Sequence, residues 1–154
     1  MLDFEQLRRK LPANSQLIIG DISETLGPFL STLQPDCPIG YIVIDVDYYS
    51  STVECLKVFS GTPNLYLPAV LMYLDDILHH DHNPSQGEYL AVTEFNSTNE
   101  MRKGYRYNFL HERRLLKNAL WINQIFLMHI LDHAHKQAPQ RYGQPQILRN
   151  PYFS

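Results

Sequence analysis

The sequence predicts one α/β domain with an open parallel sheet and flanking helices. Two nearly continuous apolar runs, residues 41 to 46 and 66 to 76, have the composition of strands buried on both faces. Segments with helical spacing of apolar residues separate and flank these runs. The chain has 154 residues, 44% of them hydrophobic and 19% charged, which is enough for one sizeable core. We expect the domain to span residues 1 to 138 and residues 139 to 154 to form an extended tail.

The first part of the chain predicts a helix, a strand and a second helix. Residues 3 to 10 are amphipathic and are followed by Pro12, and residues 15 to 21 read as a short apolar strand. Ser23 is a suitable N-cap for the next helix. The apolar positions that share one face of this helix are Leu26, Phe29, Leu30 and Leu33.

The strand at residues 41 to 46 is followed by a predicted helix. Ser51 and Glu54 have the spacing of a capping box, and Gly61 stands where this helix would stop. The next predicted strand covers residues 66 to 76.

Two further elements are expected in the second half of the chain. Residues 87 to 96 alternate loosely and predict a strand near the edge of the sheet. Residues 107 to 137 contain neither Pro nor Gly and repeat apolar side chains at helical intervals, which predicts a long helix with a break.

Paired carboxylates follow both buried runs. Asp45 and Asp47 end the first, and Asp75 and Asp76 end the second. Because ligands of open α/β sheets bind at the carboxyl ends of the strands, we expect the two pairs to meet at one edge. Carboxylates crowded together repel each other unless a cation or hydrogen bonds compensate them, and Mg²⁺ prefers such oxygen ligands. The alternative is that these residues only cap helices or lie in solvated turns.

These residues resemble a known family. The stretch GYIVIDVDYYSSTVECL followed by YLPAVLMYLDDI is similar to the metal-dependent sugar O-methyltransferases of the macrocin type. In that family one strand ends in Asp-x-Asp-x-Tyr-x-Ser-Thr and the next ends in Asp-Asp. The upstream stretch GDISETLGPFL, with Gly20, Thr25 and Leu26, is similar to an earlier strand end of the family.

The resemblance implies a Rossmann-like fold, of the kind found in class I methyltransferases, and a role for each matched residue. Asp45, Asp75 and Asp76 would hold Mg²⁺ or a similar divalent cation, and Asp47 would be the catalytic base. Gly20 and Asp21, together with Asp45, would lie near the cofactor, S-adenosylmethionine. The acceptor would be a hydroxyl group of a sugar or another small polar molecule.

The sequence also departs from the family. The glycine-rich turn that binds the cofactor and the acidic end of the second strand would precede residue 15, where the sequence has too few residues for two βα units. The resemblance therefore covers the carboxyl-terminal half of the methyltransferase fold, without its first two βα units. An exposed sheet edge would follow, and we expect a homo-oligomer.

Other patterns leave two further functions open. An Asp-x-Asp pair after an apolar strand also occurs in metal-dependent glycosyltransferases, although those do not require the second pair. A non-catalytic, truncated relative that mediates assembly is the other alternative. His79, His80 and His82 could extend a metal site, or they could lie in a solvated loop. His129 and His133 are spaced like helical zinc ligands but lack the glutamate after the first histidine.

Charge and composition narrow the range of partners that we expect. The net charge is −3, which argues against nucleic acid and anionic membranes as partners. The basic cluster of Arg102, Lys103, Arg106, Arg113 and Arg114 is expected to be a solvated face, with an anion site as the alternative. The start of the chain does not resemble a secretory signal, no apolar run is long enough to cross a membrane, and Cys37 and Cys55 read as reduced thiols. A cytoplasmic location is expected.

Overall fold

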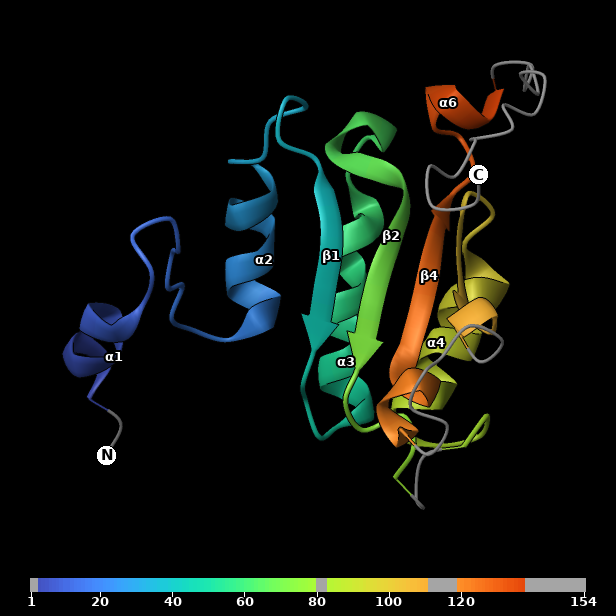
Figure 1. Ribbon diagram of the computed structural model, residues 1–154, viewed down its shortest axis with the longest axis horizontal. Coiled ribbons are helices and arrows are strands. Elements are labelled where there is room, and N and C mark those ends of the chain that lie inside the picture. The colour runs from blue at the N-terminus through green and yellow to red at the C-terminus, as the bar shows by residue number, and fades with distance from the viewer. Residues whose placement is uncertain (1–2, 80–82, 111–118, 138–154) are drawn as a thin grey trace, which may run out of the picture.

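The computed structural model describes residues 3–79, 83–110 and 119–137. It is an α/β structure with a four-stranded mixed sheet in the order β1-β2-β4-β3 (Figure 1). The strands are β1 (Ile39–Ile44), β2 (Tyr66–Leu74), β3 (Arg102–Arg106) and β4 (Ile125–Ile130). With its flanking helices, this sheet is compatible with a Rossmann-like fold.

Helices connect and flank the strands. The α-helices are α1 (Phe4–Lys10), α2 (Ile22–Leu30), α3 (Tyr49–Leu56), α4 (Gly87–Thr98) and α6 (Ala134–Gln137). Short 3₁₀ helices are η1 (Lys57–Ser60), η2 (Pro63–Leu65) and η3 (Leu120–Gln124). The helices predicted at residues 3 to 10 and after residue 21 are confirmed. The predicted tail at residues 139 to 154 lies outside the described residues.

The prediction of a parallel sheet holds for only one pair of strands. β1 and β2 are parallel, with Ile44 opposite Leu74. β4 is antiparallel to both β2 and β3. The sheet is mixed because β4 enters beside β2 from the opposite direction.

Two of the predicted strands are wrong. Residues 15 to 19 form no regular element. Residues 87 to 96 lie in helix α4, in which Ala91 and Val92 are buried and Phe95, one turn later, packs against the core. These positions recur at helical spacing, and this periodicity outweighs the loose alternation that suggested a strand.

The prediction of a long helix at residues 107 to 137 is also wrong for the residues that the structure describes. Residues 111–118 lie outside the described residues. From residue 119 to 137 the chain forms η3, strand β4 and the short helix α6. In β4, Phe126, Met128 and Ile130 are buried and alternate with less buried residues. A short apolar run fits both periods, and pairing with β2 and β3 on its two sides decided for the strand.

The predicted helix caps also differ from those observed. Asp21, rather than Ser23, caps α2, and its carboxylate accepts from the Ser23 backbone N–H at 2.8 Å. α3 begins before Ser51, with Tyr48 as its N-cap and no side-chain capping bond. Gly61 follows η1 in an extended conformation and does not end the helix in the left-handed form.

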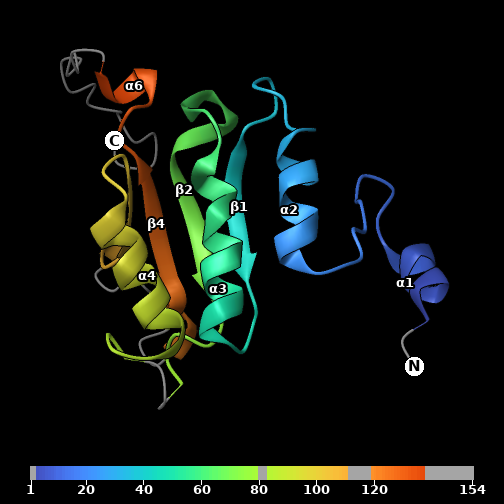
Figure 2. The ribbon, with the colours of Figure 1, turned by 180° about the vertical axis from the view of Figure 1, so that it is seen from behind.

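The core lies between one face of the sheet and helices α3 and α4 (Figure 2). Val70, Met72 and Leu74 of β2 are fully buried on this face, and so is Met128 of β4. At roughly 25 cal/mol per Å² of apolar surface removed from water, these side chains supply the main stabilisation of the fold. The opposite face of β1 and β2 has no helix over it among the described residues.

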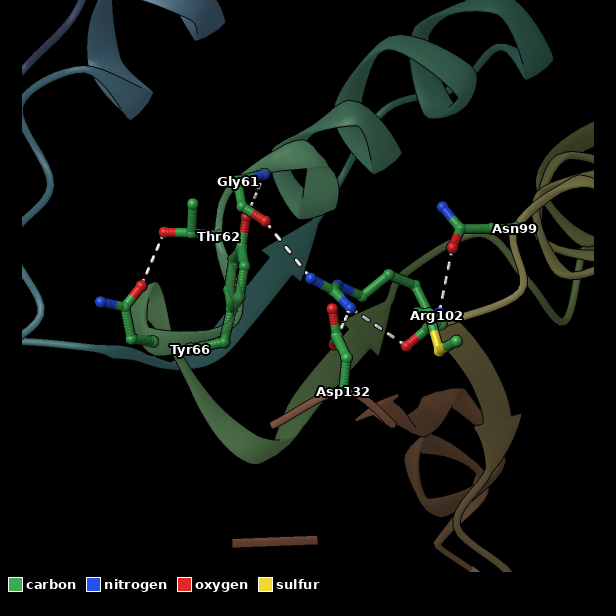
Figure 3. Close-up of polar contacts among 8 residues, drawn as sticks. Gly61, Thr62, Tyr66, Asn99, Arg102 and Asp132 are labelled. Carbon is green, nitrogen blue, oxygen red and sulfur yellow. Dashed lines mark hydrogen bonds and ion pairs between the residues drawn. The ribbon is translucent and has the colours of Figure 1, made fainter. Parts of the chain in front are cut away.

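One member of the basic cluster is a buried structural residue. Arg102 is 5% exposed and forms an ion pair with Asp132 (Figure 3). Its guanidinium also donates to the Gly61 carbonyl at 3.3 Å and lies 5.7 Å from the centre of the Tyr66 ring. The hydroxyl of Tyr66 in turn donates to the Val58 carbonyl at 2.7 Å. The expectation of a solvated face is therefore wrong for Arg102. Its guanidinium links the start of β3 to the loop before β2.

Candidate functional site

The two carboxylate pairs follow neighbouring parallel strands, as predicted. β1 ends at Ile44 and β2 ends at Leu74, and these two residues are partners in the ladder. One residue further, the backbone N–H of Asp75 donates to the Ile44 carbonyl at 3.1 Å. Asp45 and Asp75 thus leave the sheet side by side, and both are exposed.

A cavity of about 390 Å³ opens at this edge of the sheet. It brings together Asp47, from the chain after β1, and Asp76, from the chain after β2. Its other lining residues are Tyr48, Tyr49, His79, Gln86 and Gly87. Asp45 and Asp75 do not line it. α3 and α4 both begin at the end of the molecule where β1 and β2 finish, so the helix starts help to form the walls (Figure 1).

Glu88, in the first turn of α4, is the main site residue that the sequence reasoning missed. Its side chain is completely buried. Burial, and after it the negative charges of Asp76, Asp75 and Asp45, together raise the pKa of Glu88 to about 8. A hydrogen bond from the Asp76 backbone acts in the opposite direction on this pKa. The pKa of Glu88 is therefore raised by carboxylates that follow both β1 and β2.

The missed signal for Glu88 was the periodicity of α4. Glu88 lies three and four residues before Ala91 and Val92, which are both buried. A helical reading of residues 87 to 96 would have put all three side chains on the inner face. In a strand, Ala91 would instead face the side opposite to Glu88 and Val92.

Polar contacts hold the chain around the carboxylates. The Tyr73 hydroxyl donates to the Gln124 side chain at 3.0 Å, and Gln124 donates to the Asp75 carbonyl. Burial, together with hydrogen bonding to Asp75, raises the pKa of Tyr73. The Tyr49 hydroxyl, at the start of α3, donates to Glu94 in the second half of α4, which raises the pKa of Tyr49 and links the two helices.

The carboxylates where β1 and β2 end supply the oxygen donors that a hard cation prefers, but they do not form a preformed metal cage. Among the described residues, no group of three or more His, Cys, Asp or Glu side chains is placed to hold a metal ion. Mg²⁺ commonly binds through one or two carboxylates and keeps several waters, so it does not require such a group. Asp45, Asp75 and Asp76 supply only oxygen donors, as Mg²⁺ prefers.

The residues predicted to lie near the cofactor are at the start of α2. Asp21 is the N-cap, and hydrogen bonds from the Ser23 backbone and side chain lower its pKa. Gly20 has φ +145, a region that favours glycine, and an added Cβ would meet Thr25 at 2.8 Å. Neither residue lines the cavity that contains Asp47 and Asp76.

The histidine predictions divide between the described and undescribed parts of the chain. His79 lines the cavity, whereas His80 and His82 lie outside the described residues. His129 is in strand β4 and His133 follows it in a turn, so the helical spacing considered for a zinc pair does not exist. Burial and the nearby Lys136 lower the pKa of His129.

Comparisons with known proteins add nothing to this geometry. No family model, no curated protein and no solved structure matches the chain. Among the described residues, no helix has both the length and the apolar character needed to span a bilayer.

Proposed function

We propose that this protein is a metal-dependent O-methyltransferase-like protein whose site lies at the carboxyl ends of β1 and β2. The observation that carries the proposal is that Asp45, Asp47, Asp75 and Asp76 leave two adjacent parallel strands at one edge of the sheet. Crowded carboxylates need compensation, and a divalent cation supplies it. The acceptor would be a hydroxyl of a sugar or a similar small polar molecule.

The proposed roles are those that the family resemblance implies. Asp45, Asp75 and Asp76 would hold the cation together with water. The cation would lower the pKa of the acceptor hydroxyl, and S-adenosylmethionine would supply the methyl group. Asp47 is exposed within the cavity and would take the proton from that hydroxyl as the new bond from oxygen to carbon forms.

The second carboxylate pair distinguishes this proposal from glycosyl transfer. An Asp-x-Asp motif alone would need only Asp45 and Asp47 to hold a cation against a nucleotide diphosphate. Here Asp76, from the second pair, shares the cavity with Asp47. Four acidic side chains at this edge favour the methyltransferase-like arrangement.

Titration calorimetry with Mg²⁺ tests the cation site. The parent chain is compared with the double variant Asp45→Asn, Asp75→Asn and with Asp36→Asn, an exposed aspartate before β1 that serves as the matched control. We expect binding to the parent and the control, and binding weaker by at least about tenfold in the double variant, since a carboxylate contact to a cation is worth more than about 1.4 kcal/mol. Equal binding in all three proteins would contradict the proposed site.

A second titration tests the type of reaction. S-adenosylmethionine is added to the Mg²⁺-loaded parent chain, and a uridine diphosphate sugar is added in a parallel experiment. Binding of S-adenosylmethionine, with methyl transfer lost and cation binding kept in Asp47→Asn, would support the proposal. Binding of the nucleotide sugar alone would favour glycosyl transfer, and binding of neither would leave only the non-catalytic alternative.

A further inference from the structure

The N-terminal arm, defined here as residues 3 to 20, carries apolar side chains that the described part of its own chain leaves exposed. Helix α1 has no buried residue. Phe4, Leu7, Ile18 and Ile19 are 45%, 37%, 43% and 44% exposed. A helix of this length is unstable in water on its own, because too few hydrogen bonds repay its nucleation. Among the described residues, no surface of the chain buries α1.

The edge of the sheet formed by β1 lacks a covering segment among the described residues. β1 pairs only with β2, so the other side of β1 has no neighbouring strand among the described residues. Tyr41 and Val43 of β1 are 56% and 53% exposed, and they lie on the face without a helix. An open edge with exposed apolar side chains is a template for another extended segment.

The other edge of the sheet is closed. The side-chain amide of Asn96 in α4 donates to the Gly104 carbonyl at 2.7 Å and accepts from the Gly104 backbone N–H at 2.7 Å. These two bonds occupy the backbone groups that a further strand beside β3 would use. Of the two edges, β1 alone offers free pairing in the described part of the sheet.

The arm of the same chain does not reach this edge. Helix α2 stands between the arm and β1 in both views (Figures 1 and 2). Ile18 lines a hollow of about 250 Å³ with Thr25, Pro28 and Phe29 of α2. α1 projects beyond this hollow, clear of the sheet.

Charge favours a second copy of the chain as the partner. The last turn of α1 carries Arg8, Arg9 and Lys10. The chain that follows β1 carries Asp45 and Asp47. The basic end of the arm and the acidic end of the open edge are complementary, and both are present on every copy, which permits reciprocal exchange.

We propose that the N-terminal arm of one chain binds the open edge and uncovered face of β1 in a second copy. The apolar residues Ile18 and Ile19 would pack beside Tyr41 and Val43. Such an exchange buries on each copy the surfaces that the single chain leaves exposed. This inference concerns assembly and does not rest on the proposed function.

Sedimentation velocity of the full chain, over a range from low micromolar to millimolar, tests the proposal. We expect a dimer in the parent, and a dissociation constant raised at least about tenfold in the double variant Ile18→Asp, Ile19→Asp and in Val43→Lys. Leu120→Asp is the matched control, because Leu120 is 73% exposed and belongs to η3, which is part of neither the arm nor β1. It should dimerise like the parent. A parent that stays monomeric, or a dimer that survives both variants, would overturn the proposal.

Disulfide trapping tests the contact itself. The free thiols are removed with Cys37→Ser and Cys55→Ser, and Ile19→Cys is placed in one chain and Val43→Cys in another. We expect a bond between the two different chains on mild oxidation. A chain that carries both cysteines and closes on itself at high dilution, as a cross-linked monomer, would contradict exchange. Failure of the mixed chains to cross-link, while the parent dimerises, would also contradict it.

Discussion

The two faces of the sheet differ in how far their apolar side chains are buried, even within one strand. Ile44 of β1 is 2% exposed and packs under the helices, whereas its neighbour Val43 is 53% exposed. Along β2, Val70 and Met72 are fully buried, and Leu71 between them is only partly so. The covered face holds the core of this chain. The uncovered face is apolar as well, but nothing in the described part of the chain packs on β1 there.

The difference explains why these strands read as continuous apolar runs. A strand with a helical layer on each face is apolar at every position, and the sequence of β1 has this character. In the described part of the chain, helices cover one face of the sheet (Figure 2). The other apolar set is therefore available for association, which agrees with the arm exchange that we propose.

The largest effect is expected from truncating the covered face. Ile44→Ala should lower the free energy of unfolding by about 3 kcal/mol, because it removes transfer energy and leaves a cavity. Val43→Ala on the same strand should cost less than about 1 kcal/mol. Urea unfolding at one low micromolar concentration measures both. Equal losses would mean that the two faces are equally covered in solution.

The ion pair of Arg102 is expected to have the next largest effect. Asp132→Asn keeps the size of the side chain but leaves the buried guanidinium without its anion. The free energy of unfolding should fall by about 3 kcal/mol. Glu100→Gln, at an exposed position in the loop before β3, is the control and should unfold like the parent. A loss below about 1 kcal/mol in Asp132→Asn would show that the pair is effectively solvated.

Glu88, on the covered side of the sheet, should make the free energy of unfolding depend on pH. The folded chain holds the proton of Glu88 more tightly than the unfolded chain, since the pKa of Glu88 rises from 4.5 to about 8. Its contribution is fully present below pH 4.5 and is lost as the pH rises through about 8. The free energy of unfolding should therefore fall as the pH rises from 4.5 towards about 8, as urea unfolding over this pH range would show.

The variant Glu88→Gln tests this origin of the pH dependence. It should remove the slope and leave the protein more stable than the parent above pH 8, because it keeps the size of the side chain without the charge. Glu24→Gln, at an exposed position in α2, should keep the slope of the parent. A Glu88→Gln protein whose unfolding still follows the parental pH profile would assign the dependence to other groups.

The smallest effect is expected at the closed edge of the sheet. Asn96→Ala removes both side-chain bonds to Gly104 and should cost about 1 kcal/mol. Hydrogen exchange at the Gly104 amide should speed up accordingly. Thr93→Ala in the same helix, where the hydroxyl only bonds to the Tyr89 carbonyl, should leave that amide unchanged. Unchanged exchange in Asn96→Ala would mean that the edge is protected in another way.

Local patterns predicted several elements correctly. The strands at β1 and β2, the helices α1 and α2, and the carboxylates that follow both strands could all be read from composition and spacing. These elements are determined by residues close together in the chain. The parallel pairing of β1 and β2 followed because a helix-containing connection joins them.

The errors arose where a short apolar segment fitted two periods. β4 was read as helix and α4 as strand, and the neighbours of each segment in space decided between the readings. Residues 15 to 19 are apolar enough for a strand, but they pair with no strand among the described residues. Glu88 was missed for the same reason, since its importance depends on which face of α4 turns inward.

The sequence by itself determined which residues could supply chemistry and where the two parallel strands end. Only the tertiary structure decided that β4 lies antiparallel beside β2, that Arg102 is buried against Asp132, and that Glu88 feels the charges of both strand ends. The physical reason is that spacing along the chain fixes local periodicity. Burial and electrostatic fields depend on contacts between residues that are far apart in the sequence.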